Sequence, residues 1–281
     1  MIKSYFFIPS NRLDFINKIE KIDSDFFIFD LEDSINDSSY TESINNLINL
    51  TKKPNYFVRT KFIDNNNNFF SNSFKDTIEL GFYNYVIPKL ESDKQSADIE
   101  NYLLNNYSND FNKFYFILLV ESPKALMFLK ENLVKTNLNI IALALGSHDY
   151  CDSMGMKHQL KNLEFARQFV LNMAKAFGIC SIDIASMDMK NFAIFKKEAI
   201  SAFNMGYESK FILHPKQLEI LKTIIYYNKD EIKEAKLVFD SIRKVDMKDF
   251  TVIKVNDKLY ERPHIKKILN IIEWSEKYGI Q

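Results

Sequence analysis

Glycine and cysteine are scarce in this sequence, whose 281 residues include six glycines and two cysteines. Cys151 and Cys180 form no metal-ligand motif, and two isolated cysteines do not indicate the disulfide framework of a small secreted protein. No uninterrupted apolar run approaches the roughly 20 residues of a membrane-spanning helix, and the apolar stretch at the N-terminus is too short for a signal peptide. We therefore expect a cytoplasmic protein that contacts no membrane.

The sequence also lacks an excess of charge, because 37 Lys and Arg residues balance 37 Asp and Glu residues. Without a net field, nucleic acid is not an expected partner. Four motifs are absent: G-x-G-x-x-G, G-x-x-x-x-G-K-[ST], G-x-S-x-G and H-E-x-x-H. Their absence argues against Rossmann cofactors, P-loop nucleotides, an α/β-hydrolase triad and zincin chemistry. A small molecule is the expected ligand.

The sequence does contain eight short apolar runs that are rich in Ile, Val, Phe and Tyr. They are apolar on both faces, which is typical of parallel strands buried between helices. Most of the intervals show a helical period, so the pattern predicts an α/β fold, a closed (β/α)8 TIM barrel. The predicted strands span residues 4–9, 25–30, 55–60, 83–89, 114–121, 140–146, 179–184 and 210–215.

Polar or charged residues stand where these runs end. In a (β/α)8 barrel the active site lies at the C-terminal ends of the strands, which together form the mouth of the barrel. We expect the mouth to contain Asn11, Arg12, Asp30, Glu32, Asp33, Arg59, Lys89, Glu91, Glu121, Asp149, Asp183 and His214.

Glu121 and Asp149 are the strongest candidates for a metal site among these residues. They are separated by about one strand, loop and helix, so successive strands bring them side by side. Two carboxylates on adjacent strand ends can bind Mg²⁺ together with waters and leave positions for a bidentate substrate. The alternative is that each acid caps the helix that follows it. His148 adjoins Asp149 as a candidate third ligand or proton carrier, although its side chain could equally turn away.

Arg59 ends its strand with a planar guanidinium group suited to a carboxylate or an enolate oxygen. Arg12 follows the first strand and could serve the same purpose. The acidic run Asp30, Glu32 and Asp33 could hold metal-bound waters, act as a base or pair with the arginines. Internal ion pairing is the alternative for all of these residues, and the sequence alone leaves both interpretations open.

The pattern changes after the eighth strand. We expect a barrel over residues 1–228 and a C-terminal extension over 229–281 that serves as an oligomer contact. Helices are predicted over 216–228, 230–247 and 263–278, with a β-hairpin whose turn is Asn256 and Asp257. A hairpin cannot join a closed barrel, so its apolar side needs other cover.

Eight segments in register resemble the HpcH/HpaI aldolase and citrate lyase β-subunit family. FFIPSNRLDF resembles the family's F-V-P-G-N-R-P-x-x-F, and DFFIFDLEDSI resembles L-D-L-E-D-A-V. YFVRTK resembles V-R-x-N, VIPKLES resembles L-P-K-V-E-S, and LLVESPKAL resembles the I-E-T or I-E-S segment. ALALGSHDYCDSMG is similar to A-L-x-x-G-x-E-D-x-x-x-x-L-G, KFILHPKQLEIL to K-x-x-I-H-P-x-Q, and YERPHIKKI to D-x-P-x-x-x-x-A. The resemblance covers nearly the whole chain.

The resemblance implies a (β/α)8 barrel with Mg²⁺, assembly into a homo-oligomer, and cleavage or formation of a C–C bond next to a 2-oxo acid or acyl-CoA. It identifies Glu121 and Asp149 as metal ligands and Arg59 as a substrate contact. Glu121 and Arg12 are further substrate-binding candidates. The short length and the HPKQ segment resemble the citrate lyase β and malyl-CoA lyase branch, which handles CoA or acyl-carrier thioesters.

The sequence departs from the family pattern at a few positions. Ser10 and Leu13 replace the usual Gly and Pro, Lys61 stands where Asn is usual, and His148 replaces Glu. The metal ligands and the arginine remain, so these departures bear on substrate choice.

The leading hypothesis is a Mg²⁺-dependent lyase that cleaves a 3-hydroxy-acyl thioester into an acetyl-type thioester and a 2-oxo acid, or catalyses the reverse reaction. Asp33, Glu32, His148 or a group from a neighbouring subunit would be the base. Two rival hypotheses are an aldolase or condensing enzyme acting on free 2-oxo acids without CoA, and a non-catalytic subunit of a larger complex.

Overall fold

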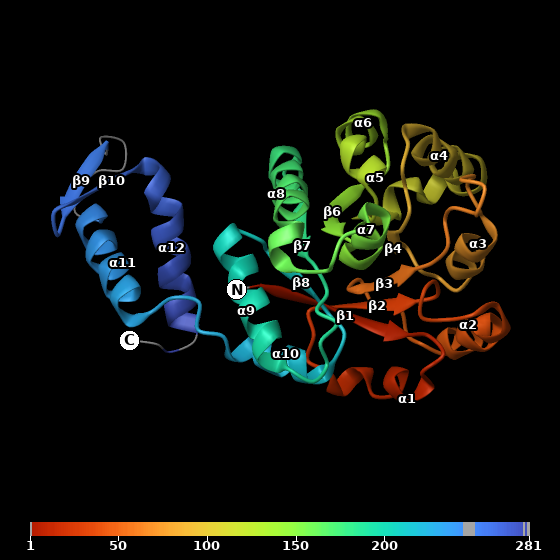
Figure 1. Ribbon diagram of the computed structural model, residues 1–281, viewed down its shortest axis with the longest axis horizontal. Coiled ribbons are helices and arrows are strands. Elements are labelled where there is room, and N and C mark those ends of the chain that lie inside the picture. Colours follow the sequence, from red (N-terminus) through yellow and green to blue (C-terminus); the bar gives the residue numbers. More distant parts are fainter. Residues whose placement is uncertain (1, 244–250, 278, 280–281) are drawn as a thin grey trace. The chain divides into compact units, whose positions relative to one another are not determined.

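The computed structural model describes residues 2–243, 251–277 and 279 (Figure 1). The chain divides into a barrel unit, Ile2–Thr223, and a C-terminal unit that begins at Ile224. This division falls a few residues before the boundary expected from the sequence. Tyr226 and Tyr227 account for the difference, because they pack against the hydrophobic cluster of the C-terminal unit.

Eight parallel strands form a closed barrel in sequential order, which confirms the predicted fold class. Closure is made by the first and last strands, where Lys3 pairs with Ser209 and Phe6 with Ile212. The strands are β1 (Lys3–Pro9), β2 (Phe26–Asp30), β3 (Tyr56–Arg59), β4 (Asn84–Ile87), β5 (Tyr115–Val120), β6 (Ile140–Leu145), β7 (Cys180–Asp183) and β8 (Ser209–Ile212).

Alternate side chains of each strand fill the barrel interior, since neighbouring residues of a strand point to opposite faces. The intervening side chains are also buried, because the helices cover the outside of the barrel (Figure 1). Burial on both sides is the reason that most strand residues are apolar. The buried interior cluster consists of Tyr5, Ile28, Phe57, Val86, Ile117, Leu119, Ala142, Ala144, Ile182 and Phe211.

Helices follow the strands, and several begin at a side-chain cap. Ser92 and Gln95 form a capping box at the start of α4, and Asn228 with Glu231 does the same for α11. Because Asn228 caps α11, the helix predicted over 216–228 ends earlier, at Thr223. Within the described residues, no helix is long and apolar enough to cross a membrane.

The barrel helices are α1 (Leu13–Ile16), α2 (Tyr40–Ile48), α3 (Asn72–Glu79), α4 (Asp93–Tyr107), α5 (Pro123–Met127), α6 (Leu129–Lys135), α7 (Ser147–Met154), α8 (Leu160–Phe177), α9 (Phe192–Met205) and α10 (Pro215–Thr223). Short 3-10 helices cover Ile19–Lys21, Asp37–Ser39 and Ser108–Lys113.

The C-terminal unit contains α11 (Lys229–Ile242), β9 (Val252–Val255), β10 (Lys258–Glu261) and α12 (Arg262–Lys277). The two strands pair antiparallel, as the predicted hairpin requires. Both turn residues have positive φ, 48° at Asn256 and 62° at Asp257, which is the geometry of a type I′ turn. Residues 244–247 of the second predicted helix and residue 278 of the third lie outside the described residues.

A fully buried charge cluster lies on the outer face of the barrel wall. Asp183 accepts a hydrogen bond from Arg167 Nε at 2.9 Å and another from Lys210 Nζ at 2.9 Å. The side chains of Asp183 and Lys210 are inaccessible to solvent, and that of Arg167 is 2% exposed. Buried charges of this kind persist only when each is paired.

Asp183→Asn should lower the free energy of unfolding by about 3–5 kcal/mol, because it leaves two cations buried without their carboxylate. Denaturant unfolding measures the effect. The matched control is Glu208→Gln, which breaks an ion pair with Lys175 at 2.7 Å whose two side chains are about half exposed. Glu208→Gln should lower the free energy of unfolding by about 0–1 kcal/mol. Equal effects of the two substitutions would contradict the structural role of Asp183.

Candidate active site

Three strands direct ionisable side chains into the mouth. These side chains belong to Asp30 on β2, Arg59 on β3 and Glu121 just after β5. Each lies two residues after an interior residue of its strand. The two-residue period of a strand therefore turns all three toward the interior, at the end where the strands stop. The interior residues that set this register are Ile28, Phe57 and Leu119.

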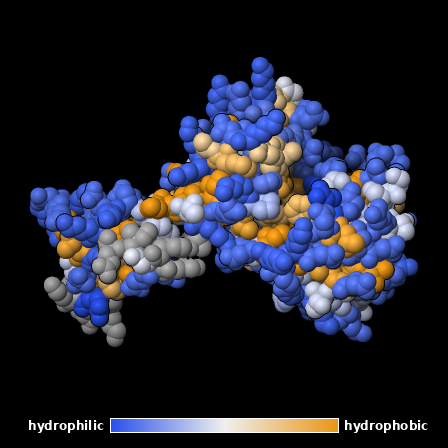
Figure 2. Space-filling model, turned by 90° about the horizontal axis from the view of Figure 1, so that it is seen from below, coloured by the Kyte–Doolittle hydropathy of each residue, from blue (hydrophilic) through white to orange (hydrophobic). Residues whose placement is uncertain are grey.

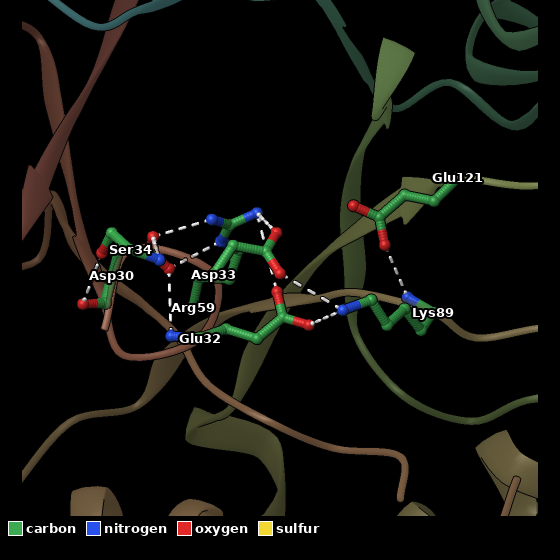
Figure 3. A network of polar contacts seen from close by, with 7 residues as sticks. All are labelled: Asp30, Glu32, Asp33, Ser34, Arg59, Lys89 and Glu121. Carbon is green, nitrogen blue, oxygen red and sulfur yellow. Dashed lines mark hydrogen bonds and ion pairs between the residues drawn. The ribbon is translucent and has the colours of Figure 1, made fainter. Parts of the chain in front are cut away.

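Arg59 lies at the centre of an acidic group (Figure 3). Its Nε and Nη2 each donate to Asp30 at 2.7 Å, and its Nη1 donates to Asp33 at 3.1 Å. Glu32 lies 3.6 Å from the same Nη1. Burial acts to lower the pKa of Arg59, but the charge of Asp30 and the hydrogen bonds to it outweigh burial and raise it. Of the five N–H donors of the guanidinium, three are used by described residues, so two remain for a ligand.

Lys89 connects this group to Glu121. Its ammonium contacts Glu32 at 2.6 Å and Asp33 at 3.3 Å, while its backbone N–H donates to Glu121 Oε2 at 2.9 Å. Figure 3 shows the lysine between the two carboxylates. Glu32 is largely buried, and burial raises its pKa although Arg59 and Lys89 act in the opposite direction.

Glu121 is a buried carboxylate of the mouth that forms no ion pair within the described part of the chain. Only 5% of the residue is exposed, and burial, then the nearby charges of Glu32 and Asp149, raise its pKa well above the usual value. Gly146, at the end of β6, makes room for it: a Cβ at that position would lie 2.4 Å from Glu121 Cγ. A residue larger than glycine at position 146 would therefore displace this carboxylate.

Asp149 lies in the first turn of α7 and faces the same space as Glu121. Both residues line a cavity of about 250 Å³, together with Asp152. Among the described residues, no ion pair joins Glu121 or Asp149 to a cationic side chain, and no group of three His, Cys, Asp or Glu side chains could enclose a metal. A buried carboxylate beside an exposed one, both lining a cavity, fits Mg²⁺, which keeps several of its waters when it binds protein.

A second cavity of about 870 Å³ adjoins the first, since Lys89 and Glu91 line both. Its volume is in the range of ordinary ligand sites. Acidic side chains outnumber lysines in its lining, with Glu32, Asp33, Asp37, Asp64, Asp76 and Glu91 against Lys61 and Lys89.

Two predicted site residues stand apart from these cavities. Arg12 pairs with Asp14 at 2.9 Å, its side chain is 53% exposed, and it lines neither cavity. His148 stacks on His158 with ring centroids 4.0 Å apart and lines neither cavity. The structure thus brings together Glu32, Asp33, Arg59, Glu121 and Asp149 and leaves Arg12 and His148 outside this group.

The prediction that Asp183 faces the mouth is wrong. Its neighbour Ile182 occupies the interior position on β7, so Asp183 points outward and pairs with Arg167 and Lys210. Two contributions were not foreseen, the positive φ of Lys89 and the space left at Gly146. A glycine directly after a strand, in a chain with six glycines, was the available signal for the second.

Comparison with known proteins places the fold and the family. A family model described as HpcH/HpaI aldolase/citrate lyase matches residues 3–215. The citrate lyase subunit beta of Escherichia coli is 22% identical over 289 residues, covering 99% of this chain and 95% of the relative. The mitochondrial citramalyl-CoA lyase of Homo sapiens is 21% identical over 293 residues, covering 96% and 84% of the two chains.

The fold is also similar to a solved structure, the CitE protein of Mycobacterium tuberculosis in complex with magnesium, acetoacetate and coenzyme A. The TM-score is 0.79 at 17% sequence identity, and the match covers 98% of each chain. At this identity the similarity establishes the barrel architecture.

The raised pKa of Glu121 makes the stability of the metal-free protein depend on pH. Its folded-state pKa lies above the unfolded value of about 4.5, so the stability that the neutral carboxyl contributes is fully present below that pH and is lost as pH rises through the folded pKa. Glu121→Gln cannot ionise. The free energy of unfolding of the variant minus that of the wild type should therefore increase as pH rises. Urea unfolding without metal between about pH 4 and 8 measures this difference.

The control for this comparison is Glu131→Gln, which removes an exposed carboxyl of α6. It shows what removing a carboxyl group from the surface does under the same conditions. A difference between Glu121→Gln and the wild type that does not change with pH would mean that the folded protein does not raise the pKa of Glu121.

Proposed function

The chain belongs to the HpcH/HpaI aldolase/citrate lyase family of carbon–carbon lyases, and we propose that it catalyses Mg²⁺-dependent cleavage of a 3-hydroxy-acyl thioester. The products are an acetyl-type thioester and a 2-oxo acid, and the reverse condensation uses the same groups. The names of the E. coli and human relatives and the magnesium, acetoacetate and coenzyme A bound to the CitE protein support this proposal.

One observation supports the proposal above all others: Glu121 is a buried carboxylate beside Asp149, with no cationic partner among the described residues. These two side chains would hold Mg²⁺. The ion would supply Lewis-acid polarisation of the oxo-acid carbonyl. The cavity in front of the pair leaves room for the carboxylate and carbonyl oxygens of the oxo acid.

Arg59 would bind negative charge on the substrate carboxylate or on the developing enolate through its two remaining N–H donors. Asp30 accepts two hydrogen bonds from its other edge and fixes the plane of the guanidinium. A donor held in place before the reaction needs no reorganisation when charge develops, and this preorganisation is usually the largest catalytic term.

The base must take the proton of the 3-hydroxyl group as the C2–C3 bond breaks. The electron pair of that bond then forms the thioester enolate, which accepts a proton at C2. Glu32 and Asp33 line the larger cavity, whereas His148 lies outside both. We assign the role to Glu32, because its Oε2 has no hydrogen-bond partner among the described residues and burial raises its pKa above the ordinary value of a glutamate.

A second candidate function is an aldolase or condensing reaction on free 2-oxo acids. The acidic lining of the larger cavity favours it, because six carboxyl groups against two lysines would repel the phosphates of CoA. A panel of CoA thioesters and of free oxo acids with aldehydes separates the two candidates by turnover.

We also propose cytosolic location and homo-oligomeric assembly through residues 229–281. Figure 2 shows hydrophobic residues exposed among hydrophilic ones on the face that it presents. The C-terminal unit contributes exposed apolar side chains, which an interface would cover. Within residues 229–281 they include Leu259 (64%), Val252 (47%) and Leu269 (45%).

Mg²⁺ binding tests the proposed function directly. Calorimetric titration of the metal-free protein with MgCl₂ should give a binding isotherm that is lost in Glu121→Gln and in Asp149→Asn, because each substitution removes one anionic ligand. Asp152→Asn is the matched control, since Asp152 lines the same cavity, and it should bind normally. Unchanged Mg²⁺ affinity in both Glu121→Gln and Asp149→Asn would rule out the proposed metal site.

Arg59→Lys should lower kcat about 100-fold or more, the scale of losing one preorganised donor, because lysine keeps the charge but not the two-pronged geometry. Thermal stability should fall too, since Asp30 loses its bidentate partner. Arg12→Lys, at the exposed pair with Asp14, should leave kcat unchanged. If Arg59→Lys alters thermal stability alone, the role of Arg59 is structural.

A further inference from the structure

Lys89 adopts a backbone conformation that its side chain disfavours. Its φ is +58°, and the other described non-glycine residues with positive φ are Asn67, Asn256 and Asp257. Asn and Asp enter this left-handed region readily, whereas a lysine does so only when its surroundings hold it there. Other contacts of Lys89 must therefore stabilise this conformation.

Those contacts lie at the two ends of the residue. The ammonium reaches Glu32 and Asp33, in the loop after β2, at 2.6 and 3.3 Å. The backbone N–H points to Oε2 of Glu121, which follows β5, at 2.9 Å. Lys89 itself follows β4, so one residue spans the mouth from the acidic loop to the carboxylate (Figure 3).

We infer that Lys89 is a positioning residue for Glu121: the ion pairs of its ammonium hold the left-handed backbone, which aims the N–H at Oε2 and fixes the carboxylate that would hold the cation. This inference rests on the proposed Mg²⁺ site at Glu121 and Asp149. It differs from a simple charge effect, because the ammonium by itself repels a cation from the site.

The two effects have opposite signs, so Mg²⁺ affinity separates them. Lys89→Ala removes the ammonium and keeps a Cβ, which lets residue 89 relax to negative φ and turns its N–H away from Glu121. Metal affinity should then fall about tenfold, the usual effect of losing an outer partner of a metal ligand. If charge alone mattered, the same variant would bind Mg²⁺ more tightly.

Lys89→Gly should restore the affinity. Glycine occupies φ near +60° without strain and keeps the N–H donor, so the bond to Glu121 survives while the repelling charge is gone. Its dissociation constant should equal that of the wild type or be smaller. The charge control is Lys61→Ala, which removes a cation from the lining of the larger cavity and should leave affinity unchanged.

The measurements are calorimetric titration of each metal-free full-length variant with MgCl₂, thermal unfolding without metal, and φ of residue 89 from crystal structures of the Ala and Gly variants. Lys89→Met makes the same prediction as Lys89→Ala and replaces it if the alanine variant does not fold. We expect the Lys89→Ala and Lys89→Met variants to bind Mg²⁺ weakly and the Lys89→Gly variant to bind it normally. Of the Ala and Gly variants, only Gly should keep a positive φ at residue 89.

The inference is overturned if Lys89→Ala binds Mg²⁺ as well as the wild type or better, or if Ala and Gly weaken binding equally. Both of these results presuppose a wild type that binds the metal, so they leave the proposed function intact. A wild-type protein that binds no Mg²⁺ overturns the proposed site and this inference together.

Discussion

The two-residue period of strands in a closed barrel is the constraint on which the site depends. It sends the last interior side chain of each strand into one ring at the mouth, where little water reaches. Ionisable groups in such a ring need partners, and most have them: Asp30 pairs with Arg59, and Lys89 with the acidic loop after β2. Glu121, by contrast, accepts from a backbone N–H and has no cationic partner among the residues that the structure describes. Glu121 is thus a buried carboxylate without an ion-pair partner among the described residues, which supports the proposal that it holds a cation.

Much of the fold was predictable because its signals are local. Strands buried between helices are mostly apolar, so the sequence predicts all eight of them. It predicts the Asn256–Asp257 turn because a two-residue hairpin needs residues that accept positive φ. The orientation of a strand is harder to predict. On β7 both faces are apolar or buried, so nothing in the sequence distinguishes the interior position of Ile182 from the outward position of Asp183.

The site was predictable where a strand fixes the side chain and less so where a loop does. Arg59 and Glu121 follow directly from strand ends. Arg12 has a partner two residues away, and a local ion pair of this kind leaves no trace in the strand pattern. His148 stacks on a histidine from the segment that follows α7. The backbone of Lys89 depends on residues from two other strands, which no local pattern contains.

The register between β1 and β8 also has a consequence for the order in which this protein takes shape. Lys3 of β1 pairs with Ser209 of β8. This pairing cannot form until nearly the whole barrel sequence has been synthesised. Contacts that span so much chain form slowly. The proposed ligands and their partners come from the segments between β2 and α7, and they leave the ribosome before the strand that closes the wall. The pairing of β1 with β8 is therefore the last part of the barrel wall that can form, after the segments that carry the proposed ligands have been synthesised.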